Sequence, residues 1–201
     1  DWQSIIKFFI MFPLYTVAKN ILDTEETNKA GYIPSFSTST SSSKICKLYK
    51  KRGQGNYNLC WAATVATIAN YRNGVAVTAK QVADSMGIAY SSGGSCSAAQ
   101  QALRNYGISY ASFRDNVGNK MTWGFLKKNI NNKYPVYVHA VTTKTAHAVT
   151  AYGYSIAGGS KYVVFWNSGN KTSTTVEFKN TGTTFSYGNK TYTWAKSVSK
   201  F

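Results

Sequence analysis

Gln54-Gly55-Asn56-Tyr57-Asn58-Leu59-Cys60-Trp61 places a cysteine beside a tryptophan, with a glutamine six residues before the cysteine. From Leu59 to Tyr71 apolar side chains recur at helical spacing, and Asn73-Gly74 ends this pattern. A thiol attacks as its thiolate, and the partial positive charge at the start of a helix stabilises that anion. The stretch therefore predicts a helix that begins near Cys60 and a nucleophilic Cys60 thiol.

A nucleophilic cysteine needs a base, and the chain has only two histidines. His147 lies in an apolar segment, where an imidazole can take the thiol proton and later give it to a leaving group. Asn167 ends the next apolar segment, and its side chain can orient that imidazole. His139 has no comparable polar residue after it, so we interpret it as structural. The alternative for His147 is a hydrogen-bonded histidine of the core.

The glutamine of the opening stretch suits a further role in acyl transfer. The carbonyl oxygen becomes negative in the transition state, and each preorganised donor aimed at it contributes about 10²–10³ in rate. The Gln54 side-chain amide lies one loop before Cys60, and the backbone N–H of Cys60 is a second donor. We predict that these two groups form an oxyanion hole; the alternative is a solvated surface glutamine.

Charge is unevenly distributed along the 201 residues. Residues 1–43 have a net charge of −1, whereas residues 44–201, with 20 Lys and Arg and three acidic residues, have a net charge of +17. Such a field favours an anionic partner, whether a cell-wall polymer, a membrane surface, an acidic protein or a nucleic acid; the alternative is that the charge maintains solubility. Because the lysines are scattered and form no basic helix or stacking motif, we expect no nucleic-acid partner.

The N-terminal 43 residues are predicted to be separate from the body of the protein. Residues 35–43 are rich in Ser and Thr, the composition of an exposed flexible linker. We predict that residues 1–43 are a pro-segment covering the reactive site, with a plain extension or an anchor helix as the alternative, and that residues 44–201 are the catalytic domain. No apolar stretch reaches the roughly 18–20 residues that span a bilayer. The chain starts at Asp1 rather than Met, which fits a removed signal peptide, and we expect a secreted protein.

Three cysteines are an odd number. If Cys60 is the reactive thiol, Cys46 and Cys96 are either a disulfide formed in an oxidising compartment or two unpaired small residues. The sequence leaves both alternatives open.

The hydrophobic pattern changes its period midway along the chain. Capped helices are predicted first: a short helix after Thr78 that ends at Gly87, one over 98–106 capped by Ser97, and one over 123–130 capped by Thr122. Short segments rich in β-branched and aromatic residues then predict strands over 136–141, 147–154, 162–166, 174–178 and 192–194. Helices followed by antiparallel strands indicate the α+β class.

Together these motifs resemble the papain-like cysteine peptidases. The resemblance rests on Gln54 and Cys60-Trp61, then His147 in a His-Ala-Val strand, then Asn167-Ser168-Gly169, in that order. Ser92-Gly93-Gly94-Ser95, which leads into a helix, adds to it. The resemblance covers residues 54 to about 169 and implies a two-lobed fold. That fold has a helical N-terminal lobe, an antiparallel β-barrel-like C-terminal lobe and the active-site cleft between them.

The resemblance also implies which residues line the cleft. In that family a Gly-Gly loop hydrogen-bonds the substrate backbone, which implies this role for Gly93 and Gly94. Trp61 and Ala146, the neighbours of the predicted nucleophile and base, are expected to bind substrate as well.

The chain departs from the family at one aromatic position. The family's usual tryptophan two residues after the Asn is absent, because that position is Gly169. Trp166 or Trp194 is expected to shield the Asn–His pair instead. Cys60 and His147 are expected to rest largely as thiolate and imidazolium, with a low thiol pKa.

Within the family, the basic body and the predicted pro-segment look most like the secreted bacterial staphopain type. The Cys-Trp-Ala-Ala-Thr run also looks like papain-related effector peptidases that bacteria deliver into host cells. The predicted function is a secreted cysteine endopeptidase that uses Cys60, His147 and Asn167, forms an acyl-enzyme intermediate and needs no metal or cofactor. Expected partners are protein or peptide substrates and a proteinaceous inhibitor or the chain's own pro-segment, and the protein is expected to be a monomer.

Two other functions stay open. One is a related acyl-transfer enzyme, such as a transglutaminase-like enzyme or an amidase acting on cell-wall peptides; those usually complete the triad with Asp or His rather than Asn. The other is a catalytically inactive papain-fold module that binds an anionic polymer. Such a module usually loses one of its site residues, whereas the chain keeps Gln54, Cys60, His147 and Asn167.

Overall fold

A computed structural model of the chain describes residues 41–48, 50–110, 112–115 and 121–201, and for 112–115 the description is limited to the backbone. The predicted pro-segment and most of the Ser/Thr-rich linker lie outside these residues. The first described strand, β1 (Ser42–Ile45), begins within the last residues of the predicted linker. The first described strand therefore begins two residues before the predicted catalytic domain.

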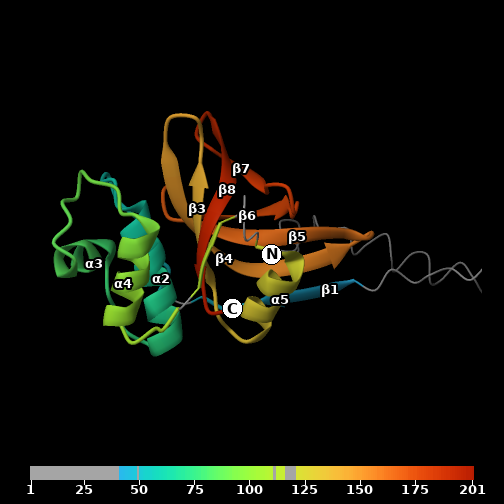
Figure 1. The fold of residues 1–201 in the computed structure, drawn as a ribbon, viewed down its shortest axis with the longest axis horizontal. Helices are drawn as coiled ribbons and strands as arrows, with labels where there is room; N and C mark the ends of the chain where they lie inside the picture. Colours follow the sequence, from blue (N-terminus) through green and yellow to red (C-terminus); the bar gives the residue numbers. More distant parts are fainter. Residues whose placement is uncertain (1–40, 49, 111, 116–120) are drawn as a thin grey trace, which may run out of the picture. The chain divides into compact units, whose positions relative to one another are not determined.

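Four helices lie in the described part of the chain (Figure 1). They are α2 (Cys60–Asn73), α3 (Ala79–Ser85), α4 (Cys96–Asn105) and α5 (Trp123–Asn131). As predicted, α2 begins at Cys60, and Gly74 closes it in the left-handed conformation at a φ of 69°. Its residues from Trp61 to Asn70 are all buried, because α3, α4 and the sheet pack around it. Cys60 is therefore held at the end of a central, fully packed helix.

Side-chain caps define where the other helices start. Thr78 and Gln81 form a capping box at α3, and the Thr122 hydroxyl accepts from the N–H of Phe125 at α5, so both predicted starts are confirmed. The predicted Ser97 cap of α4 is wrong. Ser95 caps this helix instead, because its hydroxyl accepts from the N–H of Ala98 at 3.0 Å. The cap thus directly follows the glycine pair, and the helix starts one residue later, at Cys96.

Eight strands form one antiparallel sheet within the described ranges. Besides β1 they are β2 (Ser112–Asp115), β3 (Val136–Val141), β4 (Ala146–Ala157), β5 (Ser160–Asn167), β6 (Thr172–Glu177), β7 (Thr184–Tyr187) and β8 (Lys190–Ser199). Their order is β2-β8-β3-β4-β5-β6, with β1 paired to β4 and β7 paired to β8. All five predicted strands are present with shifted ends, except β3, whose bounds are as predicted. The strands β1, β2 and β7 were not predicted.

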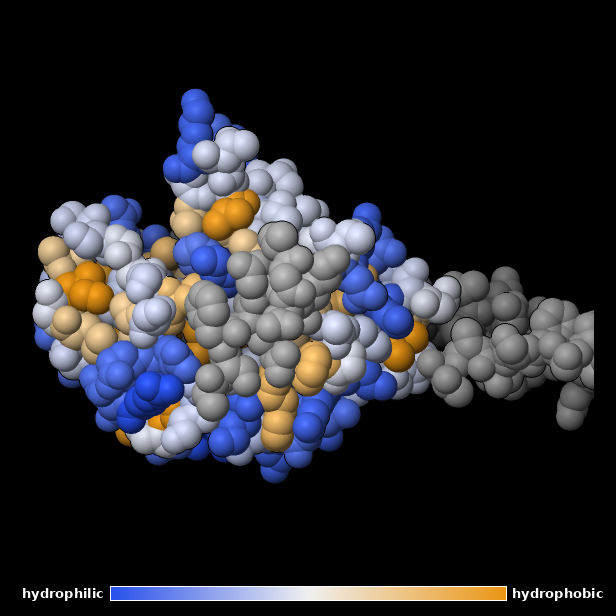
Figure 2. All heavy atoms as spheres, in the orientation of Figure 1, coloured by the Kyte–Doolittle hydropathy of each residue, from blue (hydrophilic) through white to orange (hydrophobic). Residues whose placement is uncertain are grey.

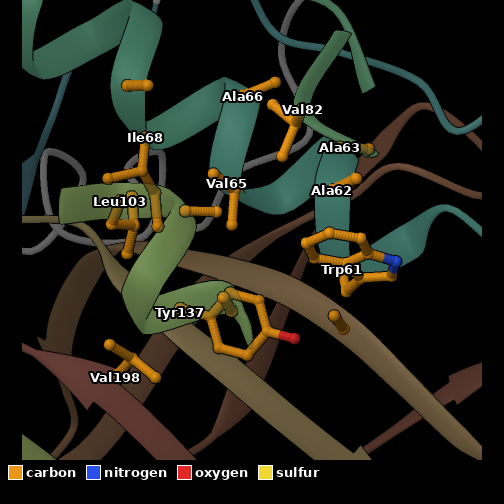
Figure 3. Close-up of a cluster of buried hydrophobic side chains, with 14 of the residues drawn as sticks. Trp61, Ala62, Ala63, Val65, Ala66, Ile68, Val82, Leu103, Tyr137 and Val198 are labelled. Atoms are coloured by element: carbon orange, nitrogen blue, oxygen red, sulfur yellow. The ribbon is translucent and has the colours of Figure 1, made fainter. Parts of the chain in front are cut away.

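Two hydrophobic cores lie on opposite faces of this sheet. Alternate residues of β3 point to different cores, as expected for a strand buried on both faces: Tyr137 belongs to the helical core, and Val136 and Val138 to the core on the other side. Figure 3 shows the helical core, where Tyr137 and Val198 of the sheet meet side chains of α2, α3 and α4. The second core contains α5 and the aromatic side chains of β5, β7 and β8. The α+β class is confirmed.

The two other cysteines belong to different cores. Cys46 packs in the core on the α5 side and Cys96 in the helical core, and both are buried. No disulfide joins them, so the disulfide alternative is wrong.

The basic side chains are spread over the surface, several of them on aromatic rings. Lys51 lies 4.8 Å from the ring centroid of Trp166, and Lys80 lies 4.6 Å from that of Tyr57. On the face drawn in Figure 2, hydrophilic residues extend over both the helices and the strands, with small hydrophobic areas between them. Within the described ranges, no helix is long and apolar enough to cross a membrane.

Candidate active site

Cys60 lies where helix α2 meets strand β4. Leu59, the residue before the helix, makes no capping hydrogen bond through its side chain, so the first N–H groups of α2 are left for another acceptor. The Cys60 sulfur is within hydrogen-bonding reach of the backbone N–H of Ala148 and of Trp61. Because Ala148 directly follows His147 in β4, the predicted nucleophile lies beside the residue next to the predicted base.

His147 is hydrogen-bonded to Asn167 across strands β4 and β5. The distance from His147 Nε2 to Asn167 Oδ1 is 2.8 Å, and both residues are buried. The same amide oxygen accepts from the backbone N–H of Gly169 at 2.9 Å, which places the oxygen rather than the NH₂ group toward the ring. An amide oxygen only accepts, so Nε2 carries the ring proton and Nδ1 of the neutral imidazole carries the lone pair.

Two tyrosines, and neither predicted tryptophan, cover the imidazole. The rings of His147 and Tyr187 are stacked, with centroids 4.6 Å apart and planes 18° apart, and Tyr192 lies at 5.6 Å. Trp166 instead donates from Nε1 to the carbonyl of Arg52, and Trp194 packs against Phe165 in the core. The expected cover of the Asn–His pair by Trp166 or Trp194 is therefore not what the structure shows, because the rings beside His147 are those of Tyr187 and Tyr192.

Gln54 is hydrogen-bonded to Ser168, the residue that follows Asn167. Its backbone N–H donates to the carbonyl of Ser168 at 3.2 Å, and the Ser168 hydroxyl donates to Gln54 Oε1 at 3.3 Å. Gln54 Nε2 donates to the carbonyl of Tyr57 at 3.1 Å. One of the two hydrogens on Nε2 is thereby used, and the second remains for a substrate oxygen. Gln54 is therefore not a loosely solvated side chain.

The glycine pair lies beside the start of α2. Gly93 is exposed and Gly94 half-buried, and Gly94 packs against the ring of Trp61. Trp61 was expected to bind substrate, but it is only 1% exposed and lies in the helical core, where it supports the loop from beneath. Ala146, the last of the predicted cleft residues, is exposed at the start of β4.

A cavity lies on each side of the glycine pair along the chain. The residues before it line a cavity of about 470 Å³, formed by Asn56, Tyr57, Asn58, Tyr90 and Ser91. The residues after it contribute to a cavity of about 210 Å³, lined by Ser95, Cys96, Ser97, His139 and Lys196. His139, interpreted from the sequence as structural, thus lines a cavity rather than a closed core.

Burial sets the protonation of the thiol and the imidazole. It raises the pKa of Cys60, and the N–H groups of Ala148, Trp61 and Cys60 itself act against this rise. Burial lowers the pKa of His147, and the hydrogen bond to Asn167 acts in the opposite direction. Both shifts favour the neutral forms, the opposite direction to the expected resting thiolate and imidazolium with a low thiol pKa. The thiol proton has to move when substrate arrives.

Across the described ranges, no three His, Cys, Asp or Glu side chains gather closely enough to hold a metal ion. The candidate site comprises the Cys60 thiol, the His147 imidazole and the Asn167 and Gln54 amides. The Ser168 hydroxyl that bonds Gln54 and the Tyr187 ring that covers His147 were not predicted from the sequence.

The chain has a central helix that starts with a cysteine. The helix packs on an antiparallel sheet that carries a histidine and an asparagine, which is the layout of the papain-like fold. The chain belongs to the Peptidase_C39 like family, whose model matches residues 43–199. No curated protein sequence matches the chain.

Two solved structures have a similar fold. One comes from work on the antibody cross-reactivity of the mite allergens Blo t 1 and Der p 1; it has a TM-score of 0.52 and 17% identity, over 83% of this chain and 74% of that one. The other, digestive procathepsin L 3 of the larval midgut of Tenebrio molitor, has a TM-score of 0.50 and 14% identity, over 86% of this chain and 74% of that one. At these identities the likeness concerns the fold, and the predicted papain-like fold is confirmed. The family supports a cysteine peptidase.

Proposed function

We propose that the protein is an endopeptidase that hydrolyses peptide bonds by acyl transfer to Cys60. The observation that carries the proposal is the hydrogen bond of 2.8 Å from His147 Nε2 to Asn167. The Cys60 thiol at the start of α2 lies by the N–H of Ala148, the residue after His147. Because Nε2 is occupied, Nδ1 is the nitrogen that accepts the thiol proton. Asn167 keeps the ring in this tautomer and does not itself exchange a proton.

Acylation follows from this arrangement. As the thiol proton moves to His147 Nδ1, the sulfur attacks the carbonyl carbon and the carbonyl oxygen becomes an oxyanion. The second N–H of Gln54 Nε2 and the backbone N–H of Cys60 donate to this oxyanion. The imidazolium then gives its proton to the leaving amine as the C–N bond breaks. The products are an acyl thioester on Cys60 and the amine fragment of the substrate.

Deacylation repeats these steps with water as the nucleophile. His147 Nδ1 takes a proton from water, and the resulting hydroxide adds to the thioester carbonyl. The C–S bond breaks, the sulfur recovers its proton from the imidazolium, and a carboxylic acid leaves. No step of this proposed mechanism needs a metal or a redox cofactor.

The direct test is alkylation by a thiol-directed epoxide together with peptide hydrolysis. We expect one label per chain, at Cys60, and loss of both labelling and hydrolysis in Cys60→Ala. Cys46→Ala is the matched control, because it removes a buried thiol from the other core and should leave both readouts intact. Hydrolysis that persists in Cys60→Ala would refute the proposal.

We also propose that the peptidase is secreted and made as a zymogen, as the staphopain-type likeness implies. Support comes from the Ser/Thr-rich residues 35–43 and the change in charge sign around them. Incubation of the full chain should give cleavage within this stretch, and Cys60→Ala should abolish it. Cleavage of a peptidoglycan digest without cleavage of proteins would favour the cell-wall amidase alternative. Salt-sensitive binding of an anionic polymer without any turnover would favour the inactive module.

A further inference from the structure

We infer that Tyr187 is a positioning residue for His147, an inference that rests on the proposed role of His147 as the base. The two rings are nearly parallel, with planes 18° apart and centroids 4.6 Å apart. Offset stacking at this separation is a favourable arrangement for aromatic rings. A stacked partner resists rotation of the imidazole about its bond to Cβ. Tyr187 therefore keeps Nε2 directed at Asn167, which leaves Nδ1 for the thiol.

The tight hairpin of β7 and β8 holds Tyr187 in place. Tyr187 pairs with Lys190, and Gly188, at a φ of 60°, makes the two-residue turn between them. Behind Tyr187, the ring of Tyr192 lies 6.4 Å away and is itself stacked on Phe185. The tyrosine that covers the base is thus the end of an aromatic row anchored in the core. It is no mobile surface side chain.

The Tyr187 ring occupies the space that a side chain at residue 169 would need. A Cβ built on Gly169 would lie 2.2 Å from Tyr187 Oη and 2.4 Å from Cζ. A side chain at residue 169 and the Tyr187 ring therefore exclude each other in this arrangement. The aromatic cover comes from a hairpin that follows Asn167 by 20 residues, and Gly169 is the position that admits it.

The first experiment measures the proton affinity of His147 without using activity. Among the described residues, the titratable side chains beside its ring are Tyr187 and Tyr192. The Cys60 sulfur lies by the neighbouring residue Ala148, and a Cys60→Ala background removes it. The chain has only two histidines, so imidazole carbon NMR resolves both, and His139→Gln assigns them. We expect Tyr187→Ala to raise the pKa of His147 by admitting water, and Tyr187→Phe to leave it unchanged. An unchanged pKa in Tyr187→Ala would overturn the inference whatever the protein hydrolyses.

The second experiment uses the exclusion between residues 169 and 187. Tyr187→Ala should lower kcat/KM by about tenfold, a part of the roughly 10²–10⁴ that a positioned acid–base group contributes. It should also move the acid limb of the pH profile to higher pH, whereas Tyr187→Phe should leave both in place. Gly169→Trp alone should lose activity because of the collision. Combined with Tyr187→Ala, it should bring activity and the acid limb back toward the original values.

The double variant of Gly169→Trp and Tyr187→Ala distinguishes a loss of activity caused by a misplaced imidazole from one caused by general damage to the β7–β8 hairpin. Thermal unfolding of every variant reports the structural cost of each change. The inference would be contradicted if Tyr187→Phe lost as much activity as Tyr187→Ala. It would also be contradicted if the double variant were no more active than either single variant. If no variant, the original chain included, hydrolyses any peptide, the proposed function fails while the NMR titration still decides the role of Tyr187.

Discussion

Gly94 lies so close to Trp61 that the indole ring leaves no room for a methyl group. A Cβ on Gly94 would come within 2.2 Å of Cδ2 of Trp61. Trp61 follows Cys60 in α2, so the loop beside the site touches the helix next to the reactive thiol. Gly93, one residue earlier, has no atom within 4 Å of where its Cβ would be. Gly94 therefore has no room for a side chain, whereas Gly93 does.

Gly94→Ala should impair the protein, and Gly93→Ala is the matched control. The collision has to be relieved by moving either the loop or the buried Trp61, and overpacking of this kind costs about 1–3 kcal/mol. We expect a lower midpoint of urea unfolding and reduced hydrolysis in Gly94→Ala. Gly93→Ala should leave the midpoint unchanged. Equal stability of the two variants would show that the loop adapts freely.

Ser168→Ala should lower activity through Gln54. The lost hydroxyl leaves Gln54 Oε1 without this donor, so the amide has fewer restraints on the orientation of its Nε2. We expect a several-fold decrease in kcat with little change in KM, and a smaller decrease than in Gln54→Ala, which removes one donor worth about 10²–10³. Steady-state kinetics of both variants check this order. A larger effect of Ser168→Ala would contradict it.

Stability should fall as the pH is lowered below the ordinary range of histidine. Burial lowers the pKa of His147, and burial with the nearby Lys196 lowers that of His139. Below about pH 6.5 the unfolded chain therefore binds protons that the folded chain still excludes, which favours unfolding. Urea unfolding at pH 7.5 and pH 5 should show the difference. His139→Gln and His147→Gln should each reduce it; an unchanged pH dependence in both would count against these shifts.

Alkylation of Cys60 should depend on pH as a neutral thiol does. Its raised pKa keeps the resting sulfur protonated at neutral pH, so the rate with iodoacetamide should keep rising into the alkaline range. His147→Gln should leave this profile nearly unchanged, because the resting pair is not ionised. A plateau in the acidic range that disappears in His147→Gln would instead reveal a resting thiolate and imidazolium.

The framework of the site could be predicted from the sequence because it depends on local signals. Apolar spacing and Asn73-Gly74 define the helix that starts at Cys60, and β-branched runs define the strands that bear His147 and Asn167. Once a helix start and two adjacent strand ends are known, the meeting of these three side chains follows from an α+β layout.

The aromatic side chains around His147 could not be predicted from the sequence in the same way. Tyr187 reaches His147 only because β7 pairs with β8, and a four-residue strand among Thr and Gly residues has a weak pattern. Residue 169 has no room for a side chain because the Tyr187 ring fills that space, and this can be seen only once the ring is in place. The protonation of Cys60 likewise depends on burial by distant segments and not on its helix position alone.

Strand β1 sets a limit on how the chain can be trimmed. It pairs residues 42–45 with β4, from Ile156 to Gly153, and the N–H of Cys46 donates to Tyr152 at 2.8 Å. The edge of the strand that bears His147 is thus supplied by residues directly after the Ser/Thr-rich stretch. Under the zymogen proposal, the cleaved protein retains that edge only if it keeps Ser42, so we expect the cleavage site to lie within residues 35–41. A cut after Ile45 would remove a strand of the sheet and weaken the support of the base.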